Sequence, residues 1–145
     1  MSGELRAADL TVAYEQRTIL DGLEVTIPSG SFTVIVGPNA CGKSTLLRSL
    51  ARLLPAAGGS VLLDSTDIRT LKSKELAKRV GLLPQTSIAP DTITVADLVS
   101  RGRHPHQGIL QRWSHDDDDA VENALERTGL TELADRSVDE LSGGQ

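Results

Sequence analysis

Residues 37–45 constrain this chain more than any other part of its sequence. They read Gly-Pro-Asn-Ala-Cys-Gly-Lys-Ser-Thr and fit the phosphate-binding loop pattern G-x-x-x-x-G-K-S/T. A β-branched run at 32–36 precedes them, and a helical pattern at 46–54 follows. A strand, a glycine turn and a helix N-terminus in this order predict an anion site. In such a site the backbone N–H groups point inward, and the helix dipole favours negative charge.

Two side chains of this loop predict the class of ligand. The ammonium of Lys43 suits the outer phosphates of a nucleotide, and the hydroxyl of Ser44 can bind Mg²⁺. We therefore predict a site for a nucleoside triphosphate with magnesium. The residues assigned to it are Gly37, Pro38, Asn39, Ala40, Cys41, Gly42, Lys43, Ser44 and Thr45. We interpret Cys41 as a small loop residue without a chemical role, which would react with thiol reagents unless the nucleotide covers it.

Composition excludes several other classes of protein. The net charge of −5 argues against non-specific nucleic-acid binding, which needs a basic face. No apolar run approaches the roughly 20 residues that span a bilayer, and the N-terminus lacks a signal-peptide pattern. A single cysteine rules out an internal disulfide. These observations suit a soluble cytosolic protein and leave room for docking onto a membrane protein.

Hydrophobic periodicity predicts alternating strands and helices. The expected extended segments are 5–14, 18–27, 32–36, 60–64 and 80–83, and the expected helices are 46–54, 73–79, 94–101 and 116–128. Residues 102–113 are expected to form a loop, and Gly129 to end the last helix. The pattern predicts an α/β fold with a largely parallel core sheet, in which the first two segments form an antiparallel flank.

The aspartates at 116–119 and two histidines raise the question of a metal site. We interpret the aspartates as an acid-rich first helical turn, because negative charge complements the helix dipole there. His104 and His106 lie in the expected loop. We assign a metal role to neither group.

The chain ends with Leu141-Ser142-Gly143-Gly144-Gln145. Alone, a serine followed by two glycines marks a common turn or helix start. After a phosphate loop and a strand that leads into Gln85, this ending resembles the signature motif of the nucleotide-binding subunit of ATP-binding cassette (ABC) transporters. The resemblance covers the whole chain. It implies a P-loop NTPase fold of the ABC type with a mixed sheet, an antiparallel β flank and a helical subdomain. Residues 1–145 would be the N-terminal portion of one such domain, and about 86–145 the helical subdomain.

The resemblance also implies roles for residues outside the loop. Tyr14 looks like the adenine-stacking aromatic, although it could merely fill a strand face. Gln85 looks like the glutamine that binds Mg²⁺ and couples the site to the membrane subunit, although it could be an ordinary loop residue. Lys43 and Gln85 are the two residues to which we assign a catalytic role. Four residues would face the ATP bound by a second subunit in a head-to-tail dimer: Ser142, Gly143, Gly144 and Gln145.

A narrower resemblance concerns the cargo. The phosphate loop with the following Leu-Leu-Arg, residues 102–106 and residues 133–141 resemble ferric-siderophore import ATPases. Relatives that import cobalamin or haem are the alternative. The implied partners are permease subunits and, indirectly, a substrate-binding protein, with the chain peripheral on the inner face of the cell membrane. An ABC-type ATPase of DNA repair is a second alternative, which the acidic charge and the absence of a heptad run disfavour.

The family pattern continues past Gln145. In relatives the further part carries an aspartate that holds Mg²⁺, a glutamate that polarises the attacking water and a histidine that senses the γ-phosphate. No residue of this chain takes those roles. Because phosphoryl transfer depends on positioning and charge stabilisation, we expect this chain to bind ATP without hydrolysing it, as a non-catalytic piece of an enzyme.

Overall fold

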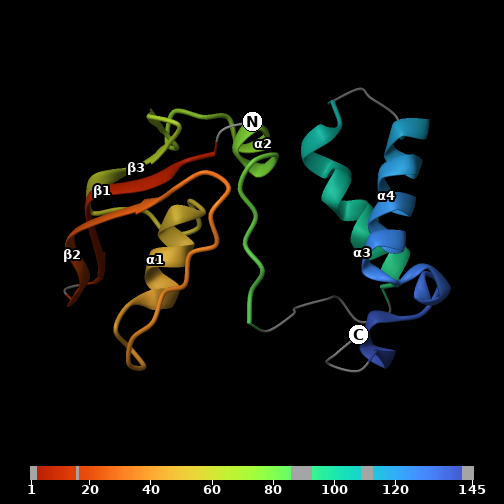
Figure 1. The fold of residues 1–145 in the computed structure, drawn as a ribbon, viewed down its shortest axis with the longest axis horizontal. Helices are drawn as coiled ribbons and strands as arrows, with labels where there is room; N and C mark the ends of the chain where they lie inside the picture. The colour runs from red at the N-terminus through yellow and green to blue at the C-terminus, as the bar shows by residue number, and fades with distance from the viewer. Residues whose placement is uncertain (1–2, 16, 86–92, 109–112, 142–145) are drawn as a thin grey trace. The chain divides into compact units, whose positions relative to one another are not determined.

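The computed structural model describes residues 3–15, 17–85, 93–108 and 113–141. The chain divides into two compact units, residues 1–83 and residues 84–145. The first unit carries a sheet and two helices, and the described part of the second is helical (Figure 1). No helix in the described ranges is both long enough and apolar enough to cross a lipid bilayer.

The first unit is built on a four-stranded sheet of order β2-β1-β3-β4. Its strands are β1 (Leu5–Tyr14), β2 (Arg17–Ile27), β3 (Gly58–Leu63) and β4 (Thr66–Asp67). Every pairing among them is antiparallel. The extended segments expected at 5–14, 18–27 and 60–64 are therefore confirmed. A two-residue turn joins β3 to β4, and its residues Asp64 and Ser65 both have positive φ (48° and 66°), as a tight hairpin turn requires.

Helix α1 (Lys43–Leu50) packs on this sheet through an aliphatic core. Leu46 and Leu50 of the helix are buried with Leu10 and Val12 of β1, both 0% exposed. Burial of this kind is the main stabilising contribution in a small domain. The short helix α2 (Ser73–Ala77), expected at 73–79, places Leu76 in the same core.

Helix α1 ends four residues earlier than the periodicity predicts. Arg52 has a φ of 56°, in the left-handed region. Its N–H donates to the carbonyl of Ser49 (3.0 Å), and the N–H of Leu53 donates to the carbonyl of Arg48 (2.8 Å). This is the Schellman arrangement, which satisfies the last helical carbonyls and turns the chain away. Glycine usually takes this left-handed position. Because arginine stands here instead, the sequence carries no signal for the end of the helix.

Two strand predictions were wrong. Residues 32–36 and 80–83 are apolar but belong to no strand among the described residues. Phe32 is 94% exposed and Leu83 is 95% exposed. A β-branched run becomes a strand only when a neighbouring strand accepts its backbone hydrogen bonds. Without such a neighbour, the largely parallel core sheet expected from the sequence is not formed in the described ranges.

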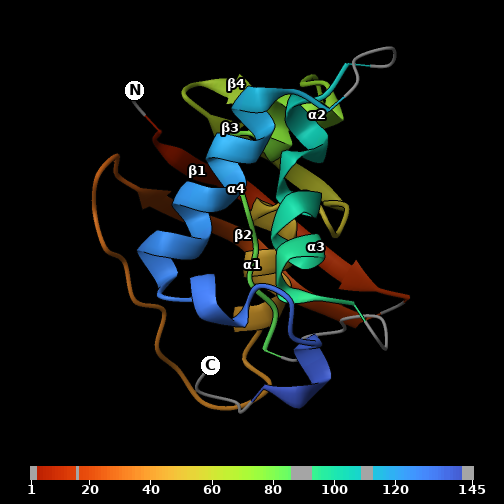
Figure 2. The ribbon, with the colours of Figure 1, turned by 90° about the vertical axis from the view of Figure 1, so that its right-hand side faces the viewer.

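The second unit centres on helices α3 (Val95–Ser100) and α4 (His115–Thr128), which lie side by side (Figure 2). Thr94 caps α3 as expected, because its side chain accepts a hydrogen bond from the N–H of Asp97 (3.1 Å). Gly129 ends α4 at a φ of 69°, also as expected. The loop expected at 102–113 is wrong in part, because Arg101–His106 forms a 3₁₀ helix, η1. Two further short helices follow, η2 (Thr131–Leu133) and η3 (Val138–Glu140).

Asp117 is the main polar link between η1 and α4. Its side chain is buried and accepts hydrogen bonds from Arg103 Nε (2.8 Å), Ser114 N (3.1 Å) and Ser114 Oγ (2.9 Å). Arg103 first, and Ser114 second, hold the pKa of this carboxyl below its ordinary value. A lowered pKa in the folded state means that the carboxylate form stabilises the fold.

This arrangement predicts acid sensitivity of the second unit. The stabilisation should be complete above the ordinary carboxyl pKa of about 4 and should be lost as pH falls through the lower folded value. Far-UV circular dichroism during thermal unfolding at pH values from 7 down to 2.5 should show this loss. Asp117→Asn should be less stable at pH 7 and should flatten the pH dependence. Asp116→Asn, an exposed neighbour in the same turn, serves as the control. An unchanged pH profile in Asp117→Asn would contradict the role of this carboxylate.

Candidate functional site

The loop of residues 37–42 leads directly into α1. Gly42 immediately precedes the helix at a φ of 96°, and its carbonyl accepts the first helical hydrogen bond, from Leu46 N (2.8 Å). A Cβ at Gly42 would lie 2.8 Å from Leu20 Cδ2 and 3.3 Å from Ile19 Cγ2. Glycine is required here for both its conformation and its size. Strand β2 therefore supports the loop at the point where the helix begins.

The first turn of α1 is suited to an anion. No side chain caps the helix N-terminus, and no acidic residue stands in the first turn. The first N–H groups of a helix have no intrahelical partner and carry the positive end of the helix dipole. Ser44, in that turn, is exposed, so its hydroxyl is accessible to a ligand or ion. These features fit the phosphate site that the sequence predicts.

Lys43 closes the loop through its side chain. Its Nζ donates to the carbonyl oxygens of Gly37 (2.8 Å) and Pro38 (2.6 Å) and lies 3.7 Å from Cys41 Sγ. Among the ion pairs of the described ranges, none involves this ammonium. Its charge is therefore not neutralised by a carboxylate in this part of the chain, and it stands at the loop that a phosphate would enter.

The loop is tightly packed on itself at Cys41. A Cβ at Gly37 would lie 2.9 Å from Cys41 Sγ, closer than side-chain atoms tolerate. The thiol is exposed and is the only one in the chain. The conformation at the loop tip includes Ala40 at a φ of 65°. The loop therefore combines close internal contacts with an open outer surface.

Tyr14 ends β1 on the side of the sheet that supports the loop. It is 42% exposed. Val12, two residues earlier, pairs with Leu20, which contacts the position of Gly42. The ring therefore belongs to the same end of the sheet as the phosphate loop. Its role in adenine stacking stays a prediction.

The remaining assigned residues belong to the second unit or fall outside the described residues. Gln85 is exposed and belongs to the second unit. Ser142, Gly143, Gly144 and Gln145 lie outside the described residues. Their roles in binding magnesium or a partner's nucleotide stay predictions. His104 and His106 are exposed residues of η1.

Sequence reasoning missed two residues that shape the site. Ile19 and Leu20 define the space that only a glycine at position 42 can enter. The alternation of residues 18–27 identifies them as strand residues. Only the approach of α1 to β2, which depends on tertiary packing, reveals them as the support of the loop.

Comparison with known proteins identifies the family. The family model described as ABC transporter matches residues 20–145, which include the whole phosphate loop. The chain belongs to the ABC transporter family. This agrees with the fold class expected from the sequence, and the antiparallel sheet of β1–β4 is part of that fold.

Individual ABC proteins resemble the chain closely. It is 53% identical over 141 residues to the ferric enterobactin transport ATP-binding protein FepC of Escherichia coli (strain K12), covering 97% of this chain and 52% of that protein. It is also 53% identical over 136 residues to the probable siderophore transport system ATP-binding protein YusV of Bacillus subtilis (strain 168), covering 94% and 50%. The structure of cbiO1 from Clostridium perfringens, described as part of the ABC transporter complex cbiONQ, superposes with a TM-score of 0.77 at 27% identity, covering 100% and 58%. The chain spans about half the length of the curated relatives it matches.

Proposed function

We propose that this chain binds ATP through residues 37–45 and forms part of the ATPase subunit of an iron–siderophore importer. The observation that carries the proposal is the loop itself. The Lys43 ammonium lies on the carbonyls of Gly37 and Pro38, beside a helix N-terminus that no side chain caps. The cargo is inferred from the resemblance to the ferric enterobactin and siderophore transport proteins of the family.

Different residues of the loop would contact different parts of the triphosphate. Backbone N–H groups from Asn39 to Thr45 would surround the phosphates, and Lys43 would neutralise the β and γ oxygens. Ser44 fits a magnesium ion, because its hydroxyl is exposed at the start of α1. Gln85 would supply a second oxygen ligand. When bound at Ser44 and Gln85, Mg²⁺ would supply positive charge that offsets the negative charge of the triphosphate. Tyr14 would stack on the adenine ring.

The proposed partners are those that the resemblance to ABC transporters implies. We propose a head-to-tail pair of subunits in which Ser142, Gly143, Gly144 and Gln145 contact the ATP bound by the partner. Closure of the pair would act on permease subunits through the region after Gln85, and hydrolysis by the whole protein would reset it. We propose that the protein acts at the inner face of the membrane. The description of cbiO1 as part of an ABC transporter complex supports assembly with other transporter subunits.

Calorimetric titration of the chain with MgATP tests the proposed site. We expect one site per chain with a Kd in the range of roughly 1 µM to 1 mM, where enzymes commonly bind their substrates. AMP, which lacks the β- and γ-phosphates, should bind at least about tenfold more weakly if the loop holds the triphosphate. Equal affinity for ATP and AMP, or no binding of ATP, would show that the loop is not the binding site. A turnover assay on the same sample separates binding from hydrolysis.

Alkylation of Cys41 provides a second test. The thiol is exposed on the phosphate loop and is the only one in the chain, so a mass shift reports on this position alone. We expect MgATP to slow its reaction with N-ethylmaleimide at least about fivefold, because bound phosphates would cover the loop. AMP at the same concentration is the control and should protect much less. Protection by AMP equal to that by ATP would place the nucleotide elsewhere.

A further inference from the structure

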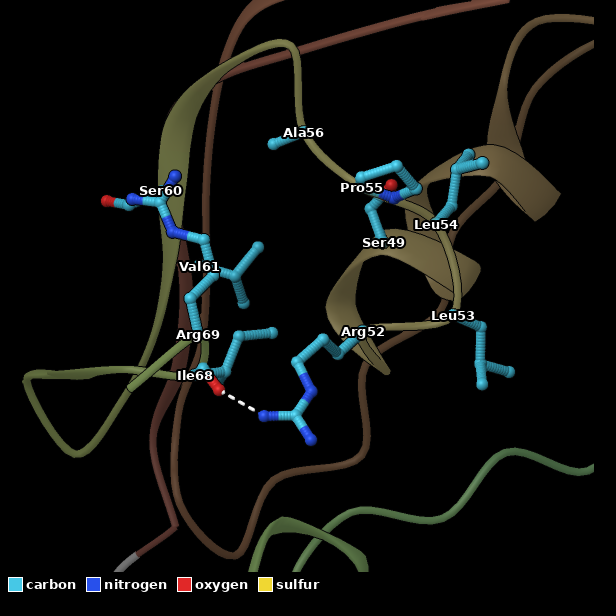
Figure 3. A pocket seen from close by; sticks show the side chains of 10 residues that line it. All are labelled: Ser49, Arg52, Leu53, Leu54, Pro55, Ala56, Ser60, Val61, Ile68 and Arg69. Carbon is cyan, nitrogen blue, oxygen red and sulfur yellow. Dashed lines mark hydrogen bonds between the residues drawn. The ribbon is translucent and has the colours of Figure 1, made fainter. Parts of the chain in front are cut away.

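A cavity of about 220 Å³ lies beside the C-terminal end of α1, away from the phosphate loop (Figure 3). Helix α1 and the segment after it form one side, and the β3–β4 hairpin forms the other. Most of its wall is apolar: Leu53, Leu54, Pro55, Ala56, Val61 and Ile68. Leu53 is 66% exposed, so the cavity reaches the surface at this residue.

One buried polar atom in the wall lacks a partner. Ser49 lines the cavity from α1 and is only 2% exposed. Among the described residues, its Oγ has no hydrogen-bond partner. Native proteins rarely leave a buried hydroxyl unpaired, because the group has lost its hydrogen bonds to water. The Ser49 hydroxyl is therefore available to one hydrogen-bonding group of a ligand that enters the cavity.

The guanidinium groups of the two arginines at the cavity already have partners within the protein. Arg52 donates through Nη1 to the carbonyls of Ile68 (2.8 Å) and Leu71 (2.7 Å), and through Nη2 to Ser73 Oγ (2.9 Å). Arg69 holds the carboxylate of Asp67 through Nε (3.0 Å) and Nη2 (2.6 Å). The first guanidinium is fixed by three acceptors, and the second is neutralised by an ion pair. Because these N–H donors are already engaged with protein acceptors and most of the wall is apolar, we infer that an uncharged ligand suits the cavity.

The size of the cavity sets the size of the ligand. A cavity of about 150 Å³ lined by aliphatic side chains accepts a benzene ring. The present cavity has room for such a ring and one substituent. The fixed guanidinium of Arg52 in the wall also favours the face of an aromatic ring.

We propose that this cavity binds a small uncharged aromatic alcohol of the size of phenol. The ring packs between the apolar walls, and the ligand's hydroxyl exchanges a hydrogen bond with Ser49 Oγ. The site is separate from the proposed ATP site and does not depend on nucleotide binding.

The test is an NMR titration of ¹⁵N-labelled chain, without nucleotide, using phenol and toluene as probes. Phenol should give saturable shifts in residues that line the cavity and should bind at least about fivefold more tightly than toluene, which lacks the hydroxyl. Ser49→Ala should bring the two affinities to within twofold of each other. Water alone in the cavity would give no saturable shifts with either probe, and this result would overturn the proposal.

A substitution that fills the cavity provides an independent test of the proposal. Ala56→Leu should weaken both probes at least about tenfold, since its added side-chain atoms occupy the space of the ring. Ala57→Leu, at the exposed neighbouring position, should leave both affinities unchanged. If Ala56→Leu fails to fold, the ratio of phenol to toluene affinity in Ser49→Ala still tests whether Ser49 binds the hydroxyl of the ligand. A ratio that stays as in the unmodified chain would overturn the assignment of Ser49.

Discussion

Replacing Gly59 by alanine is expected to lower the free energy of unfolding by about 4 kcal/mol or more, which would unfold much of the first unit. A Cβ at this position would lie 2.0 Å from the carbonyl oxygen of Asp9 and 2.4 Å from its carbonyl carbon. Both atoms belong to the backbone of β1, which pairs with β3 on either side of this point, at Ala8↔Ser60 and Thr11↔Gly58. The clash can be relieved only by separating the two strands.

Gly30→Ala is the matched control for this prediction. Gly30 has a φ of 67° and Gly59 a φ of 68°, so alanine meets the same backbone strain at both positions. No atom lies within 4 Å of a Cβ at Gly30, whereas the backbone of β1 blocks one at Gly59. We expect Gly30→Ala to cost only about 1–2 kcal/mol, the price of the left-handed conformation alone. Urea unfolding followed by circular dichroism measures both. Equal losses would mean that the close approach of β3 to β1 is not formed.

Replacing Lys43 by alanine is expected to weaken MgATP binding at least about 100-fold, equivalent to about 2.8 kcal/mol. The change removes the ammonium that would neutralise the outer phosphates. It also removes the hydrogen bonds to Gly37 (2.8 Å) and Pro38 (2.6 Å) that hold the loop closed. Calorimetric titration measures the loss. Because the lost contact is with the β- and γ-phosphates, the preference for ATP over AMP should disappear at the same time.

Lys72→Ala is the control for this second prediction. Lys72 carries the same charge and is exposed, but it stands immediately before α2, outside the phosphate loop. We expect its ATP affinity to stay within twofold of the unmodified chain. An ATP affinity in Lys43→Ala equal to that in Lys72→Ala would contradict the assignment of this loop. Circular dichroism of both variants shows whether the fold is retained.

Local signals in the sequence predicted most of the described elements correctly. The alternation of β1 and β2 and the cap at Thr94 each arise from residues close together in the chain. The same holds for Gly129, where a left-handed residue ends α4. Such features are readable because their cause is local. The end of α1 was missed because Arg52, rather than glycine, takes the left-handed position, held by distant acceptors at Ile68 and Leu71.

The amino-acid sequence by itself determined the pattern of the proposed phosphate loop, since its glycines, lysine and helix start lie within nine consecutive residues. It also determined the membership of the family through the pattern that surrounds this loop. Only the tertiary structure decided which apolar runs became strands, because a strand requires hydrogen-bonding neighbours that are distant in sequence. It likewise decided that Ile19 and Leu20 support Gly42 and that Ser49 faces a cavity. These relations depend on which surfaces meet in space, and no local pattern of residues specifies that.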